Sequence, residues 1–126
     1  TIHQALSSAL SQAGGKLLPR IEQALQTPAL SSADAAKSFG SSCHVQEGLP
    51  LIVHIVRHAS DYRSAVQENI RIGGDSCGRS ILLGAIMAAY TAQQQDNNTA
   101  IPLEWLARYR KLSIAADACA KLVVSG

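Results

Sequence analysis

The sequence has few aromatic residues, little charge and no long apolar run. Phe, Trp and Tyr make up 4% of the 126 residues, so a core has to be built from Ala, Leu, Ile and Val. The formal net charge of +2 is too small to indicate nucleic acid or an anionic membrane as a partner. The longest apolar run, Ile81–Tyr90, is too short to cross a bilayer. With 47% apolar and 16% charged residues, the chain is predicted to be globular.

Cysteines are few and far apart. Cys43, Cys77 and Cys119 are odd in number and form no CxxC pair. We therefore expect a reduced, cytoplasmic protein in which the thiols are small apolar residues. The chain starts at Thr1 without a signal-peptide pattern, and we expect residues 1–126 to be one domain or a fragment of a longer protein.

Helical periodicity and helix-ending residues predict an all-α domain without strands. The predicted helices cover residues 2–13, 19–26, 32–38, 49–59, 61–72, 81–95, 103–112 and 115–123, with a polar loop at 40–48. The helix at 81–95 is apolar all round in its first half, which predicts burial on several sides. The predicted inward faces contain Leu49, Ile52, Val53, Val56 and Ala59, then Tyr62, Ala65, Val66 and Ile70, then Trp105, Leu106 and Tyr109.

Residues 73–80 read GGDSCGRS, which nearly matches a nucleotide-binding P-loop with arginine in place of lysine. A P-loop follows a buried strand, whereas an amphipathic helix precedes this stretch. The simpler interpretation is that Gly73 and Gly74 end one helix and Asp75 caps the next. An acid next to free helix N-terminal amides is also suited to an ion or a phosphate.

Two further groups of residues have a possible chemical role. His54 and His58 have the spacing of zinc ligands on a helix, and Cys43 and His44 would complete four ligands. The simpler expectation is a solvated face that the histidines share with Arg57 and Asp61. Cys77 at a helix N-terminus is a candidate nucleophile, but burial as a small residue is the simpler expectation.

The ordered set GGDSCGRSILLGAIMAAY and IPLEWL resembles the C-terminal region of ADP-ribosylglycohydrolases, whose pattern is GGD[ST]D[ST], a small-residue helix and I-P-x-x-W. The upstream stretch FGSSCHVQEGLPLIVHIV is similar to the loop and helix that precede this pattern. The resemblance covers about residues 39–112. It implies an all-α, ADP-ribosylglycohydrolase-like helical bundle, of which this chain is the C-terminal part. It also implies hydrolysis of the bond between ADP-ribose and an acceptor, assisted by two Mg²⁺ or Mn²⁺ ions.

The resemblance assigns roles position by position. Asp75 and Ser76 match the first acid and hydroxyl of the metal motif, while Cys77 and Gly78 replace its second acid and hydroxyl. Since a neutral thiol is a poor Mg²⁺ ligand, at least one metal site is weakened or lost. The expected ligand-binding residues are Gly74, Arg79, Ser41, Ser42 and Cys43. Arg79 is expected either to bind phosphate or to pair with Asp75, and no catalytic residue is assigned.

Three functions remain open at this point. The first is part of a metal-assisted ADP-ribosyl hydrolase that is inactive in isolation, because residues 1–40 contain no acidic cluster to complete the metal site. The second is an inactive family member that binds ADP-ribose or serves as a structural module, as in lens crystallins that resemble the family. The third is an unrelated helical interaction domain. Expected partners are an ADP-ribosyl small molecule or ADP-ribosylated protein and either the remainder of a longer chain or a second copy, without nucleic acid or membrane.

Overall fold

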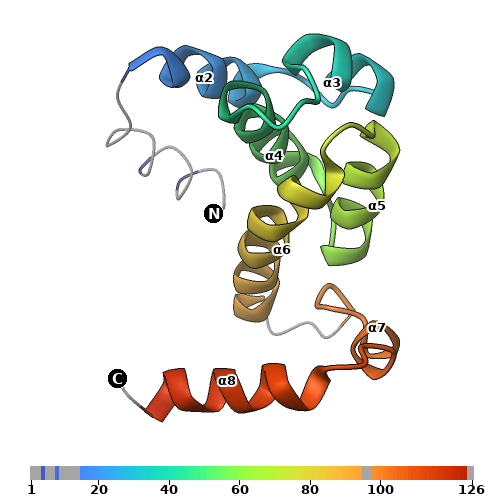
Figure 1. The fold of residues 1–126 in the computed structure, drawn as a ribbon. Helices are drawn as coiled ribbons and strands as arrows, with labels where there is room; N and C mark the ends of the chain where they lie inside the picture. The colour runs from blue at the N-terminus through green and yellow to red at the C-terminus, as the bar shows by residue number, and fades with distance from the viewer. Residues whose placement is uncertain (1–3, 5–7, 9–14, 95–97, 125–126) are drawn as a thin grey trace.

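The computed structural model describes residues 4, 8, 15–94 and 98–124, and every regular element in these ranges is helical. The elements are a short 3₁₀ helix η1 (Gly15–Leu17) and the α-helices α2 (Leu18–Gln26), α3 (Ser32–Phe39), α4 (Val45–His58), α5 (Tyr62–Ile72), α6 (Ser76–Gln93), α7 (Leu103–Ala107) and α8 (Leu112–Val124). The prediction of an all-α fold is confirmed (Figure 1). The predicted helix at 2–13 lies outside the described residues.

Local capping determines where the first helices begin and end. Pro19 occupies the first turn of α2, and the Ser31 side chain accepts a hydrogen bond from the backbone N–H of Asp34 at the start of α3. Asp61 and Ser64 form a reciprocal capping box at the start of α5. The predicted bounds of these three helices are therefore correct to within a residue or two.

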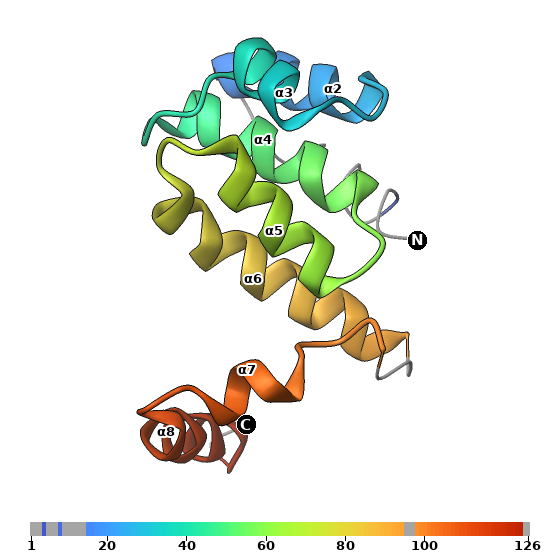
Figure 2. The same cartoon turned by 90° about the vertical axis from the view of Figure 1, so that its right-hand side faces the viewer.

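Helix α4 is the centre of the bundle and packs against α2, α3, α5 and α6 (Figure 2). It begins at Val45, one turn earlier than predicted, so residues 45–48 are not a loop. All side chains from Pro50 to Val56 are buried. His54 is only 4% exposed, because α2 and α3 cover this side of α4. The predicted solvated face is therefore wrong for His54, whereas His58 is exposed as predicted.

The core is built from aliphatic residues of α2 to α6 together with one phenylalanine. Its buried members are Ile21, Ala24, Leu25, Ala35, Phe39, Leu51, Ile52, Val53, Ile55, Val56, Ala65, Ile72, Leu83 and Met87. Ile70 is 62% exposed, so its predicted inward position in α5 is wrong.

Helix α6 buries one face and exposes the other. Leu83 and Met87 are fully buried, whereas Ile81 is 80% and Leu82 is 44% exposed. Burial on several sides is therefore not observed, because α4 and α5 cover only one side of the helix. None of the described helices is both long and apolar enough to span a membrane.

Helix α8 lies apart from the main bundle in both views, whereas α7 is joined to α5 by the ion pair between Glu104 and Arg63 (Figures 1 and 2). Helix α7 is shorter than predicted, since it ends at Ala107, and Tyr109 beyond it is 55% exposed. The predicted buried stripe is therefore wrong for Tyr109, while Trp105 and Leu106 are half-buried.

Candidate ligand-binding site

Two loops far apart in the sequence meet at one carbonyl oxygen, that of Ser41. The Asp75 backbone N–H donates to it at 2.9 Å, and Arg79 Nη1 donates to it at 3.1 Å. Gly74, with a φ of 62°, lies directly against Ser41, so that a Cβ at position 74 would overlap the same carbonyl oxygen and lie 2.7 Å from Ser41 Oγ. The loop at 40–44 and the Gly-Gly-Asp turn therefore form one unit.

Asp75 is the N-cap of α6. Its Oδ1 accepts a hydrogen bond from the Gly78 backbone N–H at 3.1 Å, which satisfies one of the free amides of the first turn. The predicted cap is confirmed. Helix α6 begins at Ser76, so Cys77, Gly78 and Arg79 belong to its first turn, earlier than the predicted start at 81.

Arg79 is 3% exposed and holds the surrounding backbone together. Its guanidinium donates to Asn69 Oδ1 at 2.8 Å and to the backbone carbonyls of Ser41 and Gly73. Burial lowers the pKa of Arg79, and the nearby Asp75 carboxylate opposes this shift. No ion pair within 4.0 Å joins Arg79 to an acid of the described residues. Its positive charge is therefore stabilised by hydrogen bonds to neutral amide and carbonyl oxygens.

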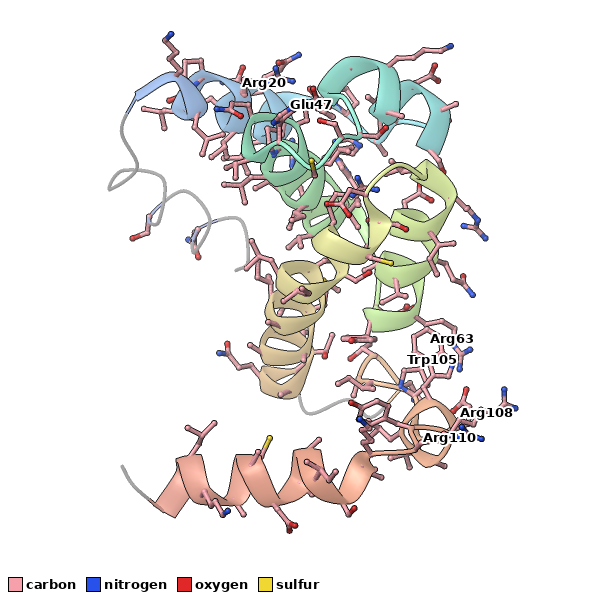
Figure 3. The ribbon with its side chains drawn as sticks, in the orientation of Figure 1. Arg20, Glu47, Arg63, Trp105, Arg108 and Arg110 are labelled. Carbon is pink, nitrogen blue, oxygen red and sulfur yellow. The ribbon has the colours of Figure 1, made fainter. Side chains whose placement is uncertain are left out.

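The loop at 40–44 is also fixed from its other side, by Glu47 in the first turn of α4. Glu47 Oε2 accepts a hydrogen bond from the Ser42 backbone N–H at 2.9 Å, and this bond lowers the pKa of Glu47. The carboxylate packs against Gly40, whose φ of 82° requires glycine. From α2, Arg20 Nη2 donates to the Phe39 carbonyl at 2.6 Å (Figure 3).

The sequence pattern alone did not indicate a role for Glu47 or Arg20. The combination of a loop glycine with an acid in the first turn of the next helix was the signal that could have identified Glu47.

A groove of about 290 Å³ opens where the two loops meet. It is lined by Ser42, Cys43, His44, Val45, Gly48, Leu49, Ile52, Asp75, Gly78, Arg79 and Leu82. The N-termini of α4 and α6 both contribute to its wall, and α4 has no side-chain cap. Uncapped first-turn amides are hydrogen-bond donors for an anion, and the α4 dipole adds positive potential there.

The expected site residues divide into two groups. Ser42, Cys43, Asp75 and Arg79 line the groove. Ser41 and Gly74 form the junction between the two loops, and Ser76 offers its carbonyl to Asn69 Nδ2 at 2.9 Å.

The described residues do not fit a two-metal centre on their own. They bring together no group of three His, Cys, Asp or Glu side chains that could hold a metal ion. Among the described residues, Asp75 is the only carboxylate lining the groove, and one of its oxygens already accepts the Gly78 N–H. Since Mg²⁺ and Mn²⁺ prefer several oxygen ligands, we derive no reaction step through a metal.

The zinc alternative has no support in the described part of the chain either. His54 is packed against Phe39 and His58, with ring centroids 5.4 and 4.7 Å away, and Cys43 and His44 lie at the opposite end of α4. Cys77 is exposed, as are Cys43 and Cys119, so the expectation of buried thiols is wrong. A P-loop is excluded here because helix α5, not a strand, precedes the Gly-Gly-Asp turn.

Comparison with known proteins identifies the family. A family model described as ADP-ribosylglycohydrolase matches residues 1–125. No curated protein and no solved structure matches the chain. Because the family match extends over nearly the whole sequence, this chain belongs to the ADP-ribosylglycohydrolase family.

Proposed function

We propose that this chain forms one wall of an ADP-ribose site, and that its groove at the α4 and α6 N-termini binds the diphosphate of an ADP-ribosyl group. Members of the family act on ADP-ribosylated substrates. The observation that carries the proposal is the uncapped N-terminus of α4, which lies beside the buried Arg79 in the groove. The substrate is an ADP-ribosyl small molecule or an ADP-ribosylated protein.

Diphosphate chemistry matches these groups. A phosphate oxygen accepts hydrogen bonds from backbone N–H groups, and the first-turn amides of Val45 and Gln46 are the ones that an uncapped α4 leaves available. Arg79 contributes positive charge without reorganising, because three neighbours already hold its guanidinium. Both features favour a bound anion before any reaction takes place.

For the whole protein we propose a hydrolase that cleaves the glycosidic bond to ADP-ribose, in which Asp75 and Ser76 take part in a Mg²⁺ or Mn²⁺ site completed by acids outside this chain. The three exposed free thiols fit a reducing compartment such as the cytoplasm.

One observation favours a second candidate, a family member that binds ADP-ribose without cleaving it. Cys77 is exposed and stands where the second acid of the motif is expected. Because its side chain is a thiol, it supplies no carboxylate oxygen to a metal ion. In this case Asp75 serves only as the helix cap of α6.

Calorimetric titration with ADP-ribose tests the binding proposal, and Val45→Pro is the informative variant. Val45 is the first residue of α4, where proline is tolerated, and His44 before it has the extended backbone that proline requires, with a φ of −72° and a ψ of 135°. The substitution removes one N–H donor and leaves the helix intact. We expect ADP-ribose to bind about 10-fold more weakly to Val45→Pro, because a hydrogen bond to a charged group contributes roughly 1.5 kcal/mol or more.

The matched control is Val45→Ala, which loses the side chain but keeps the amide and should bind like the unaltered chain. Equal affinities of Val45→Pro and Val45→Ala for ADP-ribose would show that the Val45 amide does not bind the ligand, which would contradict the proposed site. Repeating the titration with Mg²⁺ on the full-length protein, in which the acids outside this chain are present, separates the two candidates, since binding that strengthens with Mg²⁺ and is lost on Asp75→Asn supports the hydrolase. Binding that ignores both supports the metal-free binder, and Asp117→Asn on α8 is the control for the change of charge.

A further inference from the structure

A second cavity, of about 270 Å³, lies at the C-terminal end of α4. Its wall comes from the linker between α2 and α3, the last two turns of α4 and the face of α5 that carries Ser64, Glu68 and Arg71. The linker reaches α4 where His58 Nε2 lies 3.1 Å from the Thr27 carbonyl oxygen (Figure 2). The ligand groove lies at the N-terminus of the same helix, and the described linings of the two sites share no residue.

His54 gives the wall of this cavity a buried hydrogen-bond acceptor that lacks a donor. The residue is 4% exposed, and its Nδ1 has no hydrogen-bond partner within the described residues. The ring is hydrogen-bonded to the Ala24 backbone carbonyl, and because Nδ1 is unpartnered, this bond is donated by Nε2. Burial lowers the pKa of His54, so the ring is neutral at pH 7 and Nδ1 carries a lone pair. A ligand that donates an N–H to Nδ1 would satisfy it.

Glu68 on α5 supplies a second acceptor, and its carboxylate lies close enough to His54 to act on the charge of the ring. Glu68 Oε1 accepts a hydrogen bond from Ser32 Oγ at 2.6 Å, whereas Oε2 is 3.7 Å from Arg71 Nη1, which is too far for a hydrogen bond. The Glu68 side chain is 31% exposed and that of Arg71 is 64% exposed, so water screens the guanidinium more than the carboxylate. Oε2 can therefore accept a hydrogen bond from a ligand.

The end of α4 gives the cavity a negative potential. The helix ends at His58, and the negative end of its dipole lies beside the cavity, where Glu68 adds a full negative charge. Arg57 is outside the described wall, and its Nη1 donates to the Thr27 carbonyl at 3.3 Å. These charges favour a cation. Because no group of three described side chains could hold a metal ion, we expect an organic cation that brings its own N–H donors.

We propose that this cavity binds a small alkylammonium compound, whose N–H groups donate to His54 Nδ1 and Glu68 Oε2 while its hydrocarbon chain lies against Ala29, Leu30 and Ile55. An ammonium group has three N–H donors, so it can serve both acceptors at once. Ligand cavities span about 300–1,000 Å³, so a cavity of about 270 Å³ suits a compound of few heavy atoms. The proposal does not depend on ADP-ribose binding in the groove.

NMR titration of the full-length protein with n-propylammonium tests the proposal. The nitrogen signal of His54 Nδ1 reports directly on a donated hydrogen bond, and we expect it to shift to saturation with a millimolar Kd, as befits so small a probe. The matched ligand is tetramethylammonium, which carries the same charge but has no N–H. We expect it to bind about 10-fold more weakly and to leave the Nδ1 signal in place.

Three variants separate this site from a general attraction of cations to the surface. Glu68→Gln removes the charge but keeps an oxygen for Ser32, and should weaken propylammonium binding about 5-fold. The control is Glu22→Gln, because Glu22 is exposed on α2 and lies outside the cavity wall, and we expect unchanged binding. Arg71→Gln removes the like charge from the wall and should strengthen binding about 2-fold.

Two results would overturn the proposal. Equal binding by Glu68→Gln and Glu22→Gln, with helical content unchanged in circular dichroism, would show that the Glu68 carboxylate does not hold the cation. A His54 Nδ1 signal that does not respond to propylammonium would show that water or another part of the full-length protein occupies the cavity.

Discussion

Replacement of Gly74 by alanine tests how much the junction of the two loops contributes to the free energy of unfolding. The φ of 62° costs an alanine about 1–2 kcal/mol, and the new Cβ would overlap the Ser41 carbonyl oxygen. Because that atom belongs to the backbone, it cannot rotate away. The loops would have to part and lose the hydrogen bonds from Asp75 and Arg79, each worth about 1 kcal/mol. We expect a total loss of about 3–4 kcal/mol in the free energy of unfolding.

The neighbouring glycine supplies the control. Gly73 also has a positive φ, of 74°, but a Cβ there would meet no atom within 4 Å. Gly73→Ala therefore measures backbone strain alone, about 1–3 kcal/mol. Urea unfolding followed by circular dichroism, at equal m-values, compares the two variants. If both unfold at the same urea concentration, the loops are not locked together through Ser41 and the described junction is wrong.

Three other perturbations address the groups around the groove and the core. Arg79→Met should lower the free energy of unfolding by about 3 kcal/mol, because it leaves buried carbonyl oxygens without donors, whereas the exposed Arg71→Met should change it little. Glu47→Gln replaces a charged hydrogen-bond acceptor with a neutral one, so hydrogen exchange at the Ser42 amide, measured by NMR, should become about 5-fold faster. An unchanged exchange rate would contradict the conclusion that Glu47 fixes the loop at 40–44. Burial lowers the pKa of His54, so the unfolded chain binds the extra proton and stability should fall from pH 7 to pH 5; His54→Gln should flatten this slope in thermal unfolding.

Features determined by a few neighbouring residues could be predicted from the sequence. The predicted helix starts at residues 19, 32 and 61 lie within one residue of the observed starts, which Pro19, Ser31 and Asp61 determine through local geometry. The cap at Asp75 is of the same kind, since it depends on a hydrogen bond only three residues away. The expected ligand loop and metal motif also meet in space, at Ser41.

Features that depend on distant packing could not be predicted. The burial of His54 follows from the positions of α2 and α3, which its spacing with His58 does not reveal. The guanidinium of Arg79 is fixed by Asn69 and by carbonyls that are brought together only in the folded chain, which the sequence does not reveal. Its role in phosphate binding stays a prediction. The exposure of Ile81 could not be foreseen because it depends on which helices cover α6.

The proline within α4 makes the wall of the groove the least firmly held part of that helix. Pro50 is buried in the sixth position of α4 and has no N–H to donate to the Gln46 carbonyl one turn earlier. The turn from Val45 to Leu49 therefore has one hydrogen bond fewer than the rest of the helix. Local opening of this turn should require less free energy than global unfolding. The rest of the bundle can therefore stay rigid while the first turn of α4 changes its conformation around a bound ligand.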